Sequence, residues 1–80
     1  MSLTGSAEIL KKAQEGHYAV GAFNAENMEM VQAIIDAAEE MNSPVIIQTT
    51  PGTIKYADTD LFRAMVSARA KDSKVPVALH

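Results

Sequence analysis

Three short apolar runs, separated by longer segments with helical periodicity, constrain the fold of this chain more than any other feature. The runs lie within YAVGAFNA, SPVIIQT and VPVALH, and none alternates strictly between apolar and polar residues. Strands buried on both faces have this pattern, which is typical of parallel sheets covered by helices. The alternation of strand and helix indicates βαβ units with right-handed crossovers. We therefore expect an α/β protein with three parallel strands.

The segments around these runs predict three helices and one loop. SAEILKKAQEG is the first helix, with Thr4 or Ser6 as its candidate N-cap and Gly16 as the candidate residue just past its end. NMEMVQAIIDAAEEMN has the clearest helical period, since its apolar residues recur at steps of three and four: Met28, Val31, Ile34, Ile35, Ala38 and Met41. LFRAMVSARAKD is the third helix, with an apolar face of Leu61, Phe62, Met65, Val66 and Ala70. TPGTIKYADTD is expected to be a loop.

One end of the second helix carries charges that oppose its dipole. Glu39 and Glu40 lie in the last turn, where the negative end of the helix dipole disfavours carboxylates. We therefore expect other interactions to hold that end of the helix.

The spacing of the strands predicts a specific architecture. They begin near Ala19, Pro44 and Val75, about 25 and about 31 residues apart, close to the roughly 31 residues per unit of a (β/α)₈ barrel of ~250 residues. The chain would then be a leading helix and about 2.5 units in the order β-α-β-α-β, with residues 1–80 as the N-terminal fragment of a single barrel domain. Three parallel strands leave two edges and apolar surface uncovered, so we expect the functional protein to be longer.

Charge and composition exclude several classes of function. The formal net charge is −3, whereas nucleic-acid-binding domains show a basic patch. The sequence has no apolar run near the roughly 18–20 residues that cross a bilayer, and no secretory signal is visible. It has no cysteine, so disulfides and thiolate zinc sites are excluded within these residues. We therefore expect a cytoplasmic protein that binds neither nucleic acid nor membrane.

Polar residues follow each predicted strand, at the end where parallel sheets build their sites. Asn24 follows the first strand, Gln48 and Thr50 the second, and His80 the third. Each residue also has an ordinary structural interpretation: a helix cap for Asn24, a buried hydrogen bond for Gln48, turn chemistry for Thr50 and a hydrogen-bonded strand end for His80. His17 precedes a strand at the opposite end and is expected on the surface. Convergence on one rim is what favours a binding site.

The sequence as a whole resembles a known family. GHYAVGAFNAENMEMVQAIIDAAEEMNSPVIIQTTPGT together with VPVALH resembles the N-terminal portion of class II, zinc-dependent ketose-bisphosphate aldolases, from about Thr4 to His80. AEEMNSPVI with TPGT looks closest to the tagatose-bisphosphate branch, since the fructose-bisphosphate branch often carries serine where Thr50 stands. The resemblance implies a (β/α)₈ barrel, dimeric or tetrameric, that reversibly cleaves tagatose or fructose 1,6-bisphosphate to dihydroxyacetone phosphate and glyceraldehyde 3-phosphate. It also implies zinc, which polarises the ketone carbonyl, with a monovalent cation as a second candidate cofactor.

The resemblance assigns roles to four residues. Asn24 and Thr50 match substrate-binding positions, and Gln48 matches a glutamine that supports the site. His80 matches the first histidine of an HLDH motif, in which the aspartate is the acid–base residue and the second histidine is a zinc ligand. We therefore expect His80 to support the site, the catalytic residue to come just after it, and these 80 residues to hold no metal ligand and to be inactive alone.

Two non-catalytic hypotheses are alternatives to the enzyme hypothesis. The chain could belong to a non-catalytic accessory or assembly subunit of an aldolase complex, or it could be a small α/β binding domain complete in itself. Within the enzyme hypothesis the choice between tagatose and fructose bisphosphate stays open, because these residues hold no group that is expected to contact the C4 hydroxyl.

Overall fold

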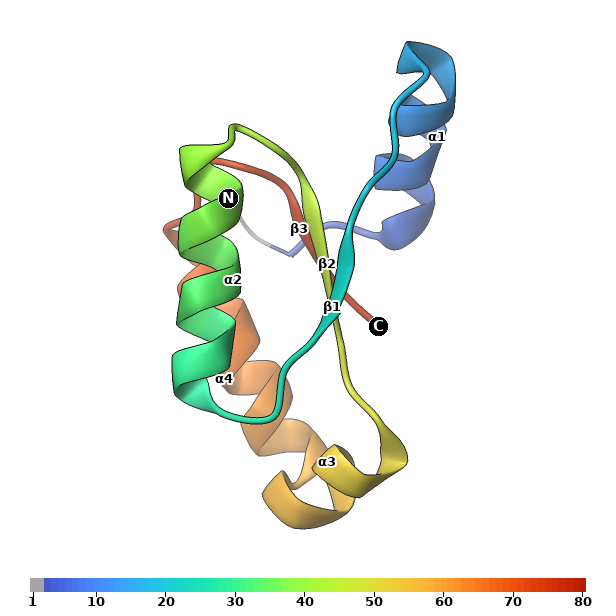
Figure 1. Cartoon of the computed structure of the whole chain (residues 1–80). Helices are drawn as coiled ribbons and strands as arrows, with labels where there is room; N and C mark the ends of the chain where they lie inside the picture. The colour runs from blue at the N-terminus through green and yellow to red at the C-terminus, as the bar shows by residue number, and fades with distance from the viewer. Residues whose placement is uncertain (1–2) are drawn as a thin grey trace.

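The computed structural model describes residues 3–80, which form a small sheet with helices on both faces (Figure 1). Its elements in chain order are α1 (Ser6–Gly16), β1 (Ala22–Asn24), α2 (Met28–Glu40), β2 (Val45–Gln48), α3 (Pro51–Ala57), α4 (Thr59–Lys71) and β3 (Val77–Leu79). The three expected strands and three expected helices are present. No helix within residues 3–80 is both long and apolar enough to span a membrane.

The segment expected to be a loop contains a helix, α3. The Thr50 side chain caps its N-terminus, where Oγ1 accepts a hydrogen bond from the Thr53 N–H at 3.2 Å, and Pro51 occupies the first turn. A threonine cap followed by proline is a favoured helix start, because proline lacks the N–H that would otherwise be unpaired there. Asp58, with a φ of 67°, ends α3 and caps α4. The expectation of a loop was therefore wrong.

The three strands form a parallel sheet in the order β1-β2-β3, as expected. Their register pairs Ala22 with Ile46 and Asn24 with Gln48, and pairs Ile46 with Ala78. The first strand is shorter than the apolar run YAVGAFNA, since only Ala22–Asn24 pairs with β2. Paired residues of parallel strands place their side chains on the same face, so this register decides which side chains share a surface.

One face of the sheet packs against α2 and α4 and forms the main core. Val45 and Ile47 of β2 and Val77 of β3 point to this face. The remaining buried members of this cluster lie on the two helices and the adjoining loops: Ala25, Val31, Ile35, Ala38, Phe62, Val66, Ala70 and Val75. Figure 1 shows both helices on one side of the strands. The crossover helices thus cover the sheet as in a βαβ unit.

The other face is covered only at its amino-terminal end, by α1. Ile9 of α1 packs against Ile46 and Ala78, which forms a second, smaller cluster. The Thr4 N–H also donates to the Val77 carbonyl oxygen at 2.8 Å. The start of the chain is therefore fixed to the last strand.

The ends of α1 differ from the sequence expectation. Its N-cap is Gly5, with no side-chain hydrogen bond, rather than Thr4 or Ser6. Its left-handed residue is His17, with a φ of 58°, rather than Gly16, and the His17 N–H donates to the carbonyls of Ala13 and Gln14. His17 is exposed, as expected, because it projects from this helix end.

Three side chains expected in the core are exposed: Met28 at 51%, Met41 at 75% and Leu61 at 69%. Met28 begins α2 and Met41 follows its last residue, so these two lie at the ends of the helix. Leu61 lies beside Phe62 in the first turn of α4, and only Phe62 turns inward. Helical periodicity alone does not distinguish these neighbours.

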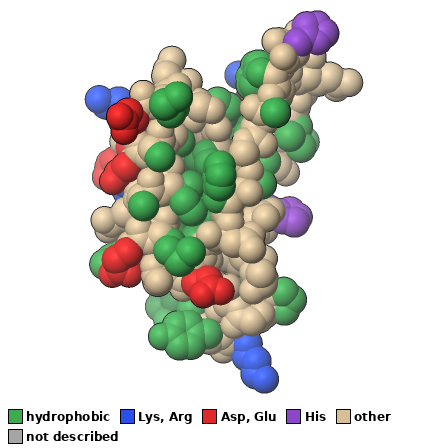
Figure 2. Space-filling model, in the orientation of Figure 1, with side chains coloured by type: hydrophobic (Ala, Val, Ile, Leu, Met, Phe, Trp, Pro, Cys, Tyr) green, Lys and Arg blue, Asp and Glu red, His purple; other side chains and the backbone are tan. Residues whose placement is uncertain are grey.

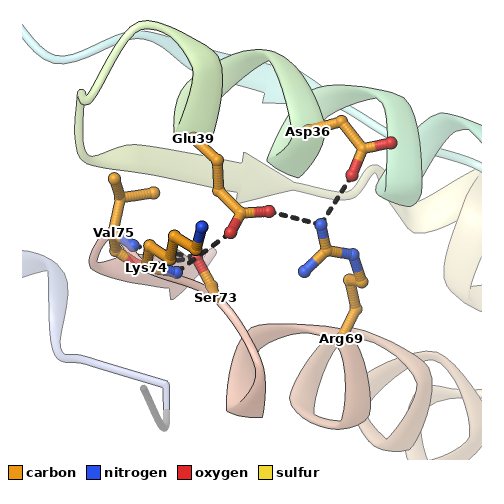
Figure 3. A network of polar contacts seen from close by, with 6 residues as sticks. All are labelled: Asp36, Glu39, Arg69, Ser73, Lys74 and Val75. Atoms are coloured by element: carbon orange, nitrogen blue, oxygen red, sulfur yellow. Dashed lines mark hydrogen bonds and ion pairs between the residues drawn. The ribbon is translucent and has the colours of Figure 1, made fainter.

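The C-terminal end of α2 is held by an arginine of α4, as its unfavourable charges suggested (Figure 3). Arg69 Nη2 contacts Asp36 Oδ1 at 2.6 Å and Glu39 Oε1 at 2.5 Å. The second oxygen of Glu39 accepts a hydrogen bond from the Lys74 N–H at 3.1 Å. One carboxylate therefore ties α2 both to α4 and to the turn that leads into β3. These contacts, first that of Arg69 and then that of the Lys74 N–H, lower the pKa of Glu39 below its ordinary value.

We expect the Glu39 contacts to make stability depend on pH. Because the pKa of Glu39 is lower in the folded chain, its contribution is fully present above the unfolded pKa, about 4.3, and is lost as the pH falls through the folded pKa. The wild type should therefore exceed Glu39→Gln in urea midpoint at pH 7, and the difference should disappear in acid. Repeating Glu39→Gln in an Arg69→Met background is the control, where the substitution should cost less. An equal cost in both backgrounds would rule out the Arg69 contact as the cause.

Candidate functional site

Two amide side chains meet where β1 and β2 end. Gln48 Nε2 donates a hydrogen bond to Asn24 Oδ1 at 2.7 Å. The contact follows from the register, because Asn24 and Gln48 are paired residues of adjacent parallel strands and share a face. Asn24 does not cap α2, since Asn27 does so through a hydrogen bond from the Met30 N–H. The capping interpretation of Asn24 is therefore wrong.

His80 completes a row across the same ends. Its N–H donates to the Ile47 carbonyl at 2.8 Å, and its carbonyl accepts from the Thr49 N–H at 2.9 Å. These bonds continue the β2–β3 register, so His80 lies beside Gln48 on the face that also carries Asn24. The sequence predicts convergence of Asn24, Gln48, Thr50 and His80 on one rim, and the structure places Asn24, Gln48 and His80 on one face at neighbouring strand ends. We call this row of Asn24, Gln48 and His80 the amide–histidine row.

The amide–histidine row lies beyond the part of the face that α1 covers. Ile46 and Ala78, one step earlier on the same face, are buried under Ile9. Asn24 and His80 are exposed, and Gln48 is half-buried. Polar side chains thus follow directly after an apolar floor, at the carboxyl ends of parallel strands, which is where ligands bind in such sheets.

Thr50 is close to this row in sequence, but its side chain caps the N-terminus of α3. Its hydroxyl accepts from the Thr53 N–H and lies 3.1 Å from the buried Thr53 hydroxyl. Ordinary turn and cap chemistry therefore accounts for its position. The buried Thr53 was not predicted from the sequence, although the spacing of Thr50 and Thr53 around Pro51 is a recognisable helix-start signal.

The described residues do not fit a zinc site. Within residues 3–80, no three histidine, aspartate or glutamate side chains come together closely enough to hold a metal ion. His80 is the only histidine of the row, so it would need ligands from elsewhere.

Comparison with known proteins decides the family. The family model for fructose-bisphosphate aldolase class-II matches residues 4–80. The chain belongs to the class II fructose-bisphosphate aldolase family. A curated member, the fructose-bisphosphate aldolase of Thermus caldophilus, is 54% identical over 80 residues, which cover all of this chain and 26% of that protein. This chain thus spans about a quarter of that aldolase.

Solved aldolase structures share the fold. The YdjI aldolase from Escherichia coli K12 matches with a TM-score of 0.87 at 37% identity, over 98% of this chain and 30% of that one. A putative fructose-1,6-biphosphate aldolase from Coccidioides immitis matches with a TM-score of 0.83 at 35% identity, over 94% of this chain and 26% of that one. The expected fold, the first units of an aldolase (β/α)₈ barrel, is confirmed.

Proposed function

We propose that this chain supplies the first part of the active-site rim in a class II aldolase that reversibly cleaves a ketose 1,6-bisphosphate. The observation that carries the proposal is the Gln48–Asn24 hydrogen bond at the carboxyl ends of β1 and β2. Membership of the aldolase family over residues 4–80 supports the reaction class. The products would be dihydroxyacetone phosphate and glyceraldehyde 3-phosphate.

The hydrogen bond suggests how the two amides divide their roles. Gln48 donates to Asn24 Oδ1, so the Nδ2 hydrogens of Asn24 are the part of that amide left to donate. We propose that they bind a substrate oxygen, with Gln48 holding the amide in this orientation. His80 would support the row through its backbone hydrogen bonds to β2. Thr50 would contact the substrate in addition to capping α3.

The proposed enzyme also uses zinc and an acid–base residue. The zinc ligands and the acid–base residue would come from outside residues 1–80. The zinc dependence of the resembling family supports it, while residues 3–80 gather no metal-ligand cluster. We propose that residues 1–80 are one portion of a single barrel domain, in a cytoplasmic homodimer or homotetramer. A monovalent cation would be a further cofactor.

The substrate is proposed to be tagatose or fructose 1,6-bisphosphate. The name of the Thermus caldophilus relative favours fructose, whereas the TPGT motif at Thr50 favours the tagatose branch. The two sugars differ only at C4. Measuring cleavage of both by the same preparation decides between them.

A chimaera in which this chain replaces the matching quarter of the Thermus caldophilus aldolase tests the function. We expect it to cleave a ketose bisphosphate, to lose activity with a zinc chelator and to regain activity with added zinc. The 80-residue chain alone, assayed in parallel, should be inactive. A folded chimaera without aldolase activity would favour the accessory-subunit hypothesis. Activity of the isolated chain would overturn the division of roles.

A further inference from the structure

A buried hydroxyl at the start of α3 is not needed to begin the helix. It belongs to Thr53, which is 5% exposed. The cap itself uses Thr50, whose hydroxyl accepts from the Thr53 N–H at 3.2 Å and whose carbonyl accepts from the Ile54 N–H at 3.1 Å. Both bonds need only the backbone of residues 53 and 54, so a valine at position 53 would leave them intact. The Thr53 hydroxyl therefore calls for another explanation.

The partner of this hydroxyl is the hydroxyl of Thr50. The two Oγ1 atoms lie 3.1 Å apart, and the Thr53 hydroxyl has no other hydrogen-bond partner within residues 3–80. Either atom could be the donor. A hydroxyl has one hydrogen and two acceptor lone pairs, so the direction of this bond decides which of the two hydrogens is left unpaired.

Burial favours donation by Thr53. If Thr50 donated instead, the hydrogen of the buried Thr53 hydroxyl would need another acceptor, and an unpaired buried donor is costly. If Thr53 donates, the unpaired hydrogen is that of Thr50, which is exposed and can bond to water or to a ligand. The reverse direction would need an acceptor in the hollow of about 310 Å³ between α3 and the loop before α2, where the Glu26 carboxylate is the candidate.

Donation by Thr53 makes the Thr50 hydroxyl a donor only. Both lone pairs of Thr50 Oγ1 are then occupied, one by the Thr53 N–H and the other by the Thr53 hydroxyl. Asn24 is oriented in a similar way, because its Oδ1 accepts from Gln48 Nε2 at 2.7 Å. In each of the two proposed substrate contacts of this chain, a neighbouring side chain therefore leaves a hydrogen available to the substrate.

The charge on α3 does not repel an anionic substrate. Lys55, in its last turn, is the one charged residue of this helix. On the face that Figure 2 shows, acidic side chains lie along α2 and near its start, and a basic side chain lies at the end of the molecule that α3 forms. The Thr50 hydrogen is therefore offered at a place that a sugar bisphosphate can approach.

We propose that Thr53 is a positioning residue for the aldolase reaction. Its hydroxyl donates to Thr50 Oγ1, and this bond leaves the Thr50 hydrogen to donate to an acceptor oxygen of the substrate. Thr53 acts through Thr50 and does not touch the substrate itself. The inference rests on the proposed function, because that function places Thr50 at the substrate.

Thr53→Val in the chimaera tests the positioning role. Valine has nearly the shape of threonine but lacks the hydroxyl, so the direction of the Thr50 hydrogen is no longer fixed. We expect the dissociation constant of fructose 1,6-bisphosphate, measured by calorimetry after zinc removal, to rise about 3- to 10-fold, the usual effect of one neutral hydrogen bond. With zinc present, KM should rise by a similar factor while kcat stays within about twofold. Thr53→Ser keeps the hydroxyl and should leave both constants near those of the wild type.

Two controls separate this effect from a general loss of structure. Ser73→Ala removes the other buried hydroxyl of residues 3–80, which bonds to the Val75 backbone. It should lower stability but change the dissociation constant by no more than about twofold. Thr50→Asn keeps a capping oxygen and removes the Thr50 hydroxyl. In that background Thr53→Val should change the dissociation constant less than about twofold, because Thr53 acts through the Thr50 hydroxyl.

Neutron diffraction from crystals of the chimaera grown in heavy water locates the hydroxyl hydrogens directly, whether or not the enzyme is active. We expect the deuterium of Thr53 to lie between the two Oγ1 atoms. A deuterium that points from Thr50 to Thr53, or from Thr53 toward Glu26, would overturn the inference. An equal rise in the dissociation constant for Thr53→Val with and without Thr50→Asn would also overturn it.

Failure of this inference is distinct from failure of the proposed function. An inactive chimaera in which Thr53→Val still weakens binding of the bisphosphate contradicts the proposed function only. An active chimaera in which Thr53→Val changes neither the dissociation constant nor KM contradicts the positioning role only.

Discussion

Phe62→Ala is expected to lower the free energy of unfolding by about 3 to 5 kcal/mol, a typical cost for emptying a buried aromatic site. Phe62 is 2% exposed and belongs to the core cluster that joins α4 to the sheet. Whole native domains have only about 5 to 15 kcal/mol of stability, so a loss of this size is a large fraction of the total. The variant should therefore have a clearly lower urea midpoint than the wild type, as followed by circular dichroism.

Leu61→Ala is the matched control for that substitution. Leu61 is the preceding residue of the same helix and is 69% exposed, so its truncation should change stability by about 0.5 kcal/mol or less. Both changes leave helix propensity similar or better, because alanine is the strongest helix former. Comparable costs for the two variants would contradict the inward orientation of Phe62.

Asn24→Asp is expected to lower kcat/KM of the chimaera by roughly 30- to 150-fold, or about 2 to 3 kcal/mol of transition-state stabilisation. The aspartate can still accept the Gln48 hydrogen bond, so the contact between β1 and β2 is retained. It cannot donate to a substrate oxygen, and its charge repels a bisphosphate. The fold should therefore persist while substrate binding suffers.

Asn27→Asp supplies the corresponding control for Asn24→Asp. Asn27 caps α2 through its Oδ1, and aspartate is an equally good N-cap. The same chemical change three residues along the loop should leave kcat/KM within about twofold. If the two variants lose similar activity, the effect belongs to charge in this loop rather than to the Asn24 amide.

The order and parallel pairing of the elements could be predicted because they depend on local patterns. The apolar runs at β2 and β3 and the period of α2 point to the same architecture, and the structure confirms it. α3 was not predicted because Thr50 and Pro51, which begin this helix, are residue types that also occur in turns. The contact of Arg69 with Asp36 spans 33 positions, and no local pattern encodes it.

The site could be predicted in part for a related reason. Parallel strands end at one edge, so three of the four predicted residues, Asn24, Gln48 and His80, lie on one face at neighbouring strand ends, whereas Thr50 caps α3. The hydrogen bond between the Asn24 and Gln48 side chains depends on the register of β1 against β2, which could not be predicted from the sequence. The substrate-binding and supporting roles of these residues stay predictions.

The attachment of α1 has a consequence for the order in which this unit folds. Thr4 bonds to Val77, and Ile9 packs against Ala78, so the segment that begins α1 has its partners in a strand that is synthesised much later. Contacts between such distant positions require closure of a long loop and form slowly. On a ribosome, α1 would wait as an amphipathic helix until β3 emerges. Docking of α1 should then be the late step of folding, and its amides the first to open.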